Sequence, residues 1–201
     1  MPTMEPAAVW STLAAERVAL ADLLDAADPS VFAKPSKCGG WRVHDVLAHL
    51  VVLAEAKGRF RFLAQGMRID PRPNASVDKM ARRLAATASP RELTERLRAA
   101  RDGHFTVPGM PPVVALGEVL VHRADIAEAA ALPIRATDNV TRAVLEAELR
   151  LWFAFGVSRS MRKRHFVPTD ANWTVGPEDG PVVEAPGEEL LLTVTGRHLP
   201  V

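Results

Sequence analysis

The sequence predicts a mainly α-helical protein, with a four-helix bundle over residues 1–131 and a small α+β domain over residues 132–201. Three observations support this fold class. Apolar residues recur at three- and four-residue steps in four segments before residue 132, as on helices with one buried face. Later in the chain, short alternating stretches are interrupted by Pro, Gly and Asp. Finally, ionisable side chains stand on two of the apolar helix faces, an arrangement typical of bundles that bind a metal ion in their core.

The four bundle helices follow from this periodicity. In the first, Trp10, Leu13 and Leu20 share one face. The third begins at Ser89 and Pro90, because serine accepts backbone N–H bonds at a helix start and proline fits the first turn. The predicted helices span residues 4–27, 42–65, 90–101 and 113–130, and Gly58 is a potential weak point in the second.

The segment between the second and third helices, residues 66–88, is predicted to be a surface loop. It is rich in arginine and short polar residues and contains Pro71 and Pro73. Within it, a short helical turn is expected near residues 77–86. Beyond the bundle we expect a helix over residues 139–155, extended stretches at 166–167, 173–175 and 182–184, and a last helix over 188–195.

The composition narrows the class of protein. Of the 201 residues, 48% are hydrophobic and 24% are charged, as in an ordinary globular protein. The net charge of +1 gives no reason to expect binding to nucleic acid or to an anionic membrane. Cys38 is the only cysteine, which excludes an internal disulfide and fits a reducing compartment. The first ten residues lack the pattern of a signal peptide and no apolar run is long enough to span a membrane, so we expect a cytoplasmic protein. We expect it to be a monomer or a homodimer.

Three side chains suggest a site. Glu118 and His122 lie four residues apart in an apolar segment, and therefore on the same face of its helix. His49 stands on the inward face of the second helix, and unpaired polar groups are costly to bury, so we expect the three to meet. Two imidazoles and one carboxylate suit a divalent metal ion with positions left open for water or substrate. The competing interpretation is a hydrogen-bonded core histidine and a separate Glu–His pair on the helix surface.

Five short segments resemble one known family. The segments SKCGGW at 36–41 and VHDVLAHL at 43–50 look like the start of the family's second helix, and GEVLVHRADI at 117–126 looks like its second ligand motif. PTDANWTVG at 168–176 and LLLTVTGR at 190–197 are similar to the C-terminal domain of many members. The chain therefore resembles the mycothiol-dependent maleylpyruvate isomerase family, part of the DinB/YfiT-like superfamily of metal-binding four-helix bundles.

The resemblance implies a site and two cofactors. The family's three metal ligands match His49, Glu118 and His122, and its metal is usually zinc. Its thiol cosubstrate is mycothiol, and the arginine that assists catalysis in its C-terminal domain matches Arg197. One residue departs from the pattern, because Arg42 replaces the Ser or Thr that often begins the second helix.

The resulting hypothesis is a divalent-metal-dependent enzyme that uses mycothiol, or a similar small thiol, on a small electrophile. Attack by the thiolate gives S-transfer if the adduct is kept, and cis–trans isomerisation if the adduct reverses after bond rotation. The alternatives are a non-catalytic ligand-binding or scaffold protein, and a zinc-dependent hydrolase in which water takes the open position.

Two further residues lie within these motifs. Asp125, one turn after His122, either holds the free ring nitrogen of that histidine or is a solvent-exposed carboxylate. Cys38 is expected to pack within its turn rather than to act as a ligand or nucleophile.

Overall fold

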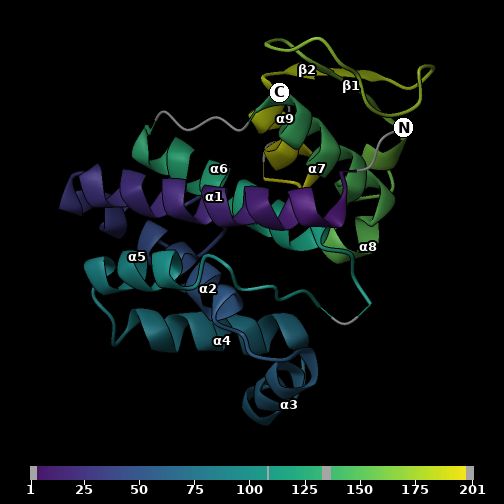
Figure 1. The fold of residues 1–201 in the computed structure, drawn as a ribbon. Helices are drawn as coiled ribbons and strands as arrows, with labels where there is room; N and C mark the ends of the chain where they lie inside the picture. The colour runs from purple at the N-terminus through teal and green to yellow at the C-terminus, as the bar shows by residue number, and fades with distance from the viewer. Residues whose placement is uncertain (1–3, 108, 133–136, 198–201) are drawn as a thin grey trace.

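The computed structural model describes residues 4–107, 109–132 and 137–197, and its centre is a bundle of four helices (Figure 1). Helix α1 packs against α5 and α6, and α2 contacts the same two helices from the other side. These are the four helices that the apolar periodicity predicts, and the mainly α-helical fold class is confirmed. Their bounds are α1 Pro6–Ala26, α2 Val43–Ala54, α5 Pro90–Ala99 and α6 Val113–Ala130.

The expected single helix over residues 42–65 is wrong, because the chain breaks into α2 and α3 (Arg59–Ile69). The break falls at Gly58, whose φ of +75° is a left-handed conformation that glycine adopts without steric cost. At the other end, Asp45 compensates for Arg42. Its carboxylate accepts the Arg42 backbone N–H at 2.9 Å and forms an ion pair with the Arg42 guanidinium at 3.1 Å.

The predicted loop over residues 66–88 is also wrong, because most of it forms helix α4, Pro73–Ala85. Pro73 stands in the first turn, where the missing N–H group would have no helical partner in any case. Asp70 fixes the turn before it by accepting the Arg72 N–H at 2.9 Å and pairing with Lys79 at 2.7 Å. Helix α4 packs along α2, while α3 packs on α4 and lies at the far lower end of the molecule in Figure 1.

The C-terminal part combines helices with a two-stranded parallel sheet. Residues His165 and Val182 pair at the start of its register. The helix expected over 139–155 is divided at Leu151, and the stretch 173–175 contributes only a bridge between Val175 and Phe166. The elements are α7 Asp138–Arg150, α8 Trp152–Phe155, β1 His165–Pro168, β2 Val182–Ala185 and α9 Gly187–Val194, with short 3-10 turns at Pro29–Ala33 and Met161–Lys163.

One continuous hydrophobic core joins the two parts of the chain. It contains Leu47 of α2 and Leu120 of α6 as well as Leu145 of α7, Phe166 of β1 and Leu191 of α9. Helices α7 and α9 pack against α6, and the strands lie beyond α9 at the top of Figure 1. The division at residue 132 remains a prediction.

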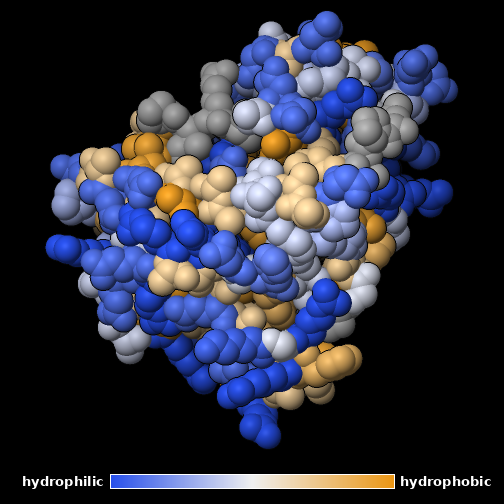
Figure 2. Space-filling view, in the orientation of Figure 1, coloured by the Kyte–Doolittle hydropathy of each residue, from blue (hydrophilic) through white to orange (hydrophobic). Residues whose placement is uncertain are grey.

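Hydrophilic residues cover most of the face drawn in Figure 2, with apolar residues scattered among them. In the described part of the chain, no helix combines the length and the apolar character that a membrane span requires.

A buried cation connects the C-terminal part to the bundle. Arg123 of α6 is 1% exposed, and its guanidinium forms ion pairs with Glu16 of α1 and Glu188 of α9. Because a buried charge is costly without partners, these carboxylates hold α1, α6 and α9 together.

We expect Arg123→Met to lower the free energy of unfolding by about 3 kcal/mol, because it leaves the carboxylates of Glu16 and Glu188 close together without their shared cation. Urea denaturation followed by circular dichroism measures the change. The control is Arg142→Met, which removes a more exposed partner of Glu146 within α7 and should cost less than about 1 kcal/mol. Equal losses in the two variants would contradict the role assigned to Arg123.

Candidate metal centre

The three predicted ligand residues converge between α2 and α6. His49 Nε2 lies 3.4 Å from Glu118 Oε2, and His122 Nε2 lies 3.5 Å from the same oxygen. One ligand atom from each residue falls within 4.8 Å of the others. Both histidines are buried, whereas the Glu118 side chain is 33% exposed and lines a cavity. The packing of α2 on α6 therefore produces a compact group of two nitrogens and one oxygen.

These separations suit a tetrahedral metal ion. Ligand atoms that each lie about 2.1 Å from a tetrahedral ion are about 3.4 Å apart, which agrees with the distances from Glu118 Oε2 to the two histidine nitrogens. An ion held by these three donors would keep its fourth position for a small molecule from the cavity. The donor set of two imidazoles and one carboxylate suits zinc and several other divalent ions.

Asp125 supports one of the imidazoles. Its Oδ2 lies 2.9 Å from His122 Nδ1, which sets the tautomer that presents an unprotonated Nε2 to the cluster. Asp125 therefore holds the free ring nitrogen of His122, as the first of its two expected roles, and is not a solvent-exposed carboxylate. Its side chain is completely buried. His49 lacks equivalent support, because its buried Nδ1 has no hydrogen-bond partner among the described residues.

The three groups shift one another's protonation. Burial opposes the charged form of each, but the two histidines outweigh it for Glu118 and lower the pKa of that carboxyl. The pKa of His49 is lowered, mainly by burial. For His122 burial is again the largest single effect, yet hydrogen bonds to Asp125 and Glu118 overcome it and raise its pKa. Without a metal ion, His122 is therefore the imidazole that holds a proton to higher pH.

The loop before α2 brings two further residues to the cluster. The Trp41 ring centre lies 5.1 Å from that of His49, and its Nε1 donates to Asp78 at 2.6 Å. The Cys38 thiol lies within 4.8 Å of ligand atoms of His122 and Asp125. The expectation that Cys38 only packs within its turn is thus incomplete, because its side chain also lines the cavity. Burial raises the pKa of this thiol, which keeps it protonated.

Arg197 reaches the cluster from the end of α9. Its Nε lies 3.1 Å from Asp125 Oδ1, so the carboxylate that holds His122 also holds this guanidinium. Behind it, Glu148 of α7 is fully buried, and its carboxyl oxygens have no hydrogen-bond partner among the described residues. Burial raises the pKa of Glu148 well above its usual value despite the nearby charge of Arg197. Nothing in the sequence pattern distinguishes Glu148 from other helix carboxylates.

Two cavities open at the cluster, and both are lined by Glu118, His122 and Arg197. The larger, of about 450 Å³, extends towards α3 and α4. The smaller, of about 310 Å³, opens beside α8 and Thr195. Here α8 approaches α6 so closely that the Phe155 ring would meet a Cβ atom on Gly117 at 2.7 Å, which explains why glycine precedes Glu118.

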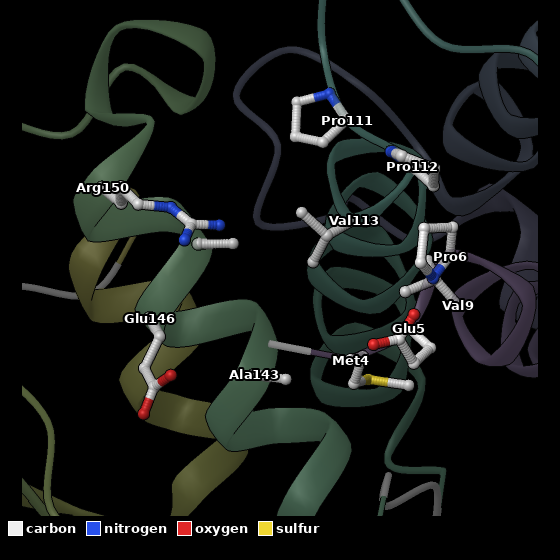
Figure 3. A pocket seen from close by; sticks show the side chains of 11 residues that line it. Met4, Glu5, Pro6, Val9, Pro111, Pro112, Val113, Ala143, Glu146 and Arg150 are labelled. Carbon is white, nitrogen blue, oxygen red and sulfur yellow. The ribbon is translucent and has the colours of Figure 1, made fainter. Parts of the chain in front are cut away.

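A third hollow, of about 280 Å³, lies apart from the cluster (Figure 3). It is bounded by the start of α1, by Pro111 and Pro112 before α6, and by Glu146 and Arg150 of α7. Glu146 is engaged by Arg142 at 3.0 Å. Within the described ranges, no group of candidate metal ligands lies at this hollow.

Comparison with known proteins identifies the family. The family described as the mycothiol maleylpyruvate isomerase N-terminal domain matches residues 13–127, more than half of the chain. The chain belongs to this family. The match begins within α1, stops in the last turn of α6, and includes His49, Glu118 and His122. The comparison with curated proteins gave no match.

Two solved structures share the fold of this chain. One is the mycothiol-dependent maleylpyruvate isomerase, with a TM-score of 0.54, and the other is a His-to-Ala mutant of that enzyme, with a TM-score of 0.56. Each is 16% identical to this chain, and each alignment covers 98% of this chain and 90% of the other. The similarity therefore extends through the C-terminal part, beyond the residues that the family match covers.

If the cluster binds zinc, Asp125→Asn should weaken that binding by about 10- to 100-fold, because the amide no longer stabilises the ring orientation and basicity of His122. Competition with a fluorescent zinc chelator measures the affinity. The control is Asp102→Asn, which alters an exposed carboxylate beside Arg101 and should leave the affinity unchanged. A change of less than about twofold in Asp125→Asn would contradict this support.

Zinc affinity should also depend on pH, because one proton must leave the cluster before the ion binds. His122 must lose its proton to bind, and its raised pKa means that affinity falls about tenfold per pH unit once the pH drops below that pKa. His49, whose pKa is lowered, loses its proton at a lower pH than His122 does. In Asp125→Asn the decline should begin at lower pH, since Asp125 helps to raise the His122 pKa. A zinc titration series from about pH 5.5 to 8 tests this, and an affinity that is independent of pH would refute it.

Proposed function

We propose that this protein is a divalent-metal-dependent enzyme that uses mycothiol, or a similar small thiol, for S-transfer to a small electrophile or for its cis–trans isomerisation. The observation that carries the proposal is the geometry of His49, Glu118 and His122, with their donor atoms at the spacing of a tetrahedral ion and at the junction of two cavities. Membership of the mycothiol maleylpyruvate isomerase family supports the choice of thiol and the reaction class.

In this proposal His49, Glu118 and His122 are the metal ligands and Zn²⁺ is the preferred ion. When bound, such an ion supplies a positive charge that favours the deprotonated, nucleophilic form of a small thiol near neutral pH. Glu118 remains ionised because both histidines lower its pKa, so it offers a carboxylate at neutral pH. Asp125 keeps the His122 ring in place.

Arg197 is the proposed catalytic residue for the electrophile. Its guanidinium lines both cavities next to the cluster, and Asp125 holds it at 3.1 Å. When the thiolate forms a bond to the β-carbon of an unsaturated carbonyl compound, the π electrons move to the carbonyl oxygen. Arg197 would offset the negative charge that develops there.

Two outcomes follow from the same adduct. If the former double bond rotates and the carbon–sulfur bond then breaks, the thiol is released and the product is a cis–trans isomer. If a proton is added to the adjacent carbon instead, the S-conjugate is kept and the net reaction is transfer.

The test is thiol-dependent turnover by the zinc-loaded protein. With mycothiol present, we expect product from an α,β-unsaturated carbonyl compound, and a rate at least about 100-fold lower in His49→Ala, because loss of one ligand removes the metal. The control is His104→Ala, which alters an exposed histidine stacked on Trp10 and should retain full activity.

Turnover that needs no thiol would replace this proposal with a metal-dependent hydrolase. Ligand binding without turnover under any of these conditions would replace it with a non-catalytic binding protein.

A further inference from the structure

The larger cavity at the cluster has a predominantly apolar wall. Helix α3 contributes Phe62, Leu63 and Met67 to it, and the opposite side includes Phe105 and Val119. The rings of Phe62 and Phe105 lie 4.6 Å apart between their centres, so an aromatic pair closes part of the wall. The volume of about 450 Å³ is within the range of sites that enclose a small organic molecule.

The side chains that line this cavity offer few cations that are free to bind an anionic substrate. Among the described residues, three arginines and three carboxylates line it: Arg17, Arg59, Arg197, Asp70, Asp78 and Glu118. Two of the arginines are already engaged, since Arg17 donates to the backbone carbonyl groups of residues 100, 101 and 103 and Arg197 pairs with Asp125. A small dicarboxylate, which needs several cations close together, would find few of them along this wall.

The apolar wall continues to the mouth of the cavity. Leu63 is 41% exposed and Met67 is 59% exposed, and Val107 is more than half exposed on the other side. An apolar ligand that covers these side chains removes apolar surface from contact with water, which makes the free energy of binding more favourable. The smaller cavity has a mainly polar lining, which includes Thr195 in addition to Asn74 and Arg197 that line both cavities.

We propose that the electrophile of this enzyme carries an apolar, aromatic or branched hydrocarbon body, which binds against the apolar wall that α3, Phe105 and Val119 form while its reactive carbon reaches the His49–Glu118–His122 cluster. This substrate class rests on the proposed function for its chemistry. Binding of the hydrocarbon body rests on the cavity alone, and a small dicarboxylate is the substrate class that the proposal excludes.

The experiment is isothermal titration calorimetry of the zinc-loaded full chain without thiol, using benzylacetone and succinate as probes. Benzylacetone carries a phenyl ring and a ketone but no reactive double bond, so Cys38 cannot trap it. We expect benzylacetone to bind and succinate to bind at least about tenfold more weakly. Leu63→Glu should weaken benzylacetone binding at least about tenfold, because it places a charge on the apolar wall.

The matched control is Phe60→Glu on the same helix, at a residue that is 79% exposed and outside the cavity lining. It should change the affinity for benzylacetone less than twofold. Both substituted residues are exposed, and circular dichroism confirms that each variant is folded. Tighter binding of succinate, no binding of benzylacetone, or equal effects of the two variants would each overturn the inference.

The binding experiment tests the apolar substrate site and the turnover experiment tests the proposed function, so either proposal can be contradicted without the other. Benzylacetone binding without thiol-dependent turnover of any electrophile would contradict the proposed function but support the apolar site. Thiol-dependent turnover of a dicarboxylate by a protein that does not bind benzylacetone would support the function and refute the apolar substrate class.

Discussion

The packing of α2 against α6 is the constraint on which the rest of the site depends. It brings His49 Nε2 to 3.4 Å from Glu118, across 69 residues of sequence. Glu118 and His122 are neighbours on one helix wherever that helix lies, but only this contact adds the third donor. The three groups are costly to bury separately and compatible when a cation lies among them, because the carboxylate and two neutral imidazoles together offer it three lone pairs. Metal binding would therefore account for these polar groups at a buried position where an apolar side chain would otherwise pack.

The C-terminal part completes this site rather than only adjoining it. Arg123 links α6 to α9 through Glu188, and a shared apolar core continues across the interface. With α9 held there, Arg197 at its end reaches Asp125, the same carboxylate that positions His122. One buried aspartate therefore couples the proposed metal ligand to the proposed catalytic arginine. The two cavities then approach the cluster along walls of different character, one mainly apolar and one polar.

Much of this arrangement was predictable from the sequence. The four bundle helices follow from apolar spacing, and the convergence of His49 with Glu118 and His122 follows from the need to pair buried polar groups. Helix α4 was missed because Pro73 looks like a loop residue, although proline is equally suited to the first turn of a helix. The proximity of Cys38 could not be predicted, since it depends on long-range contacts such as the 2.6 Å ion pair between Lys37 and Glu128 that fixes its loop on α6. Glu148 gave no signal, because burial of a helix carboxylate depends on what packs over it.

The central claim is that His49, Glu118 and His122 hold a divalent metal ion, and the most direct test is the metal content of the freshly purified protein. Inductively coupled plasma mass spectrometry of the wild type and of His49→Ala, prepared identically, gives the stoichiometry. We predict close to one ion per chain in the wild type and little in the variant. The absence of metal from both proteins, even after zinc is added and excess removed, would contradict the account and indicate a binding or scaffold protein.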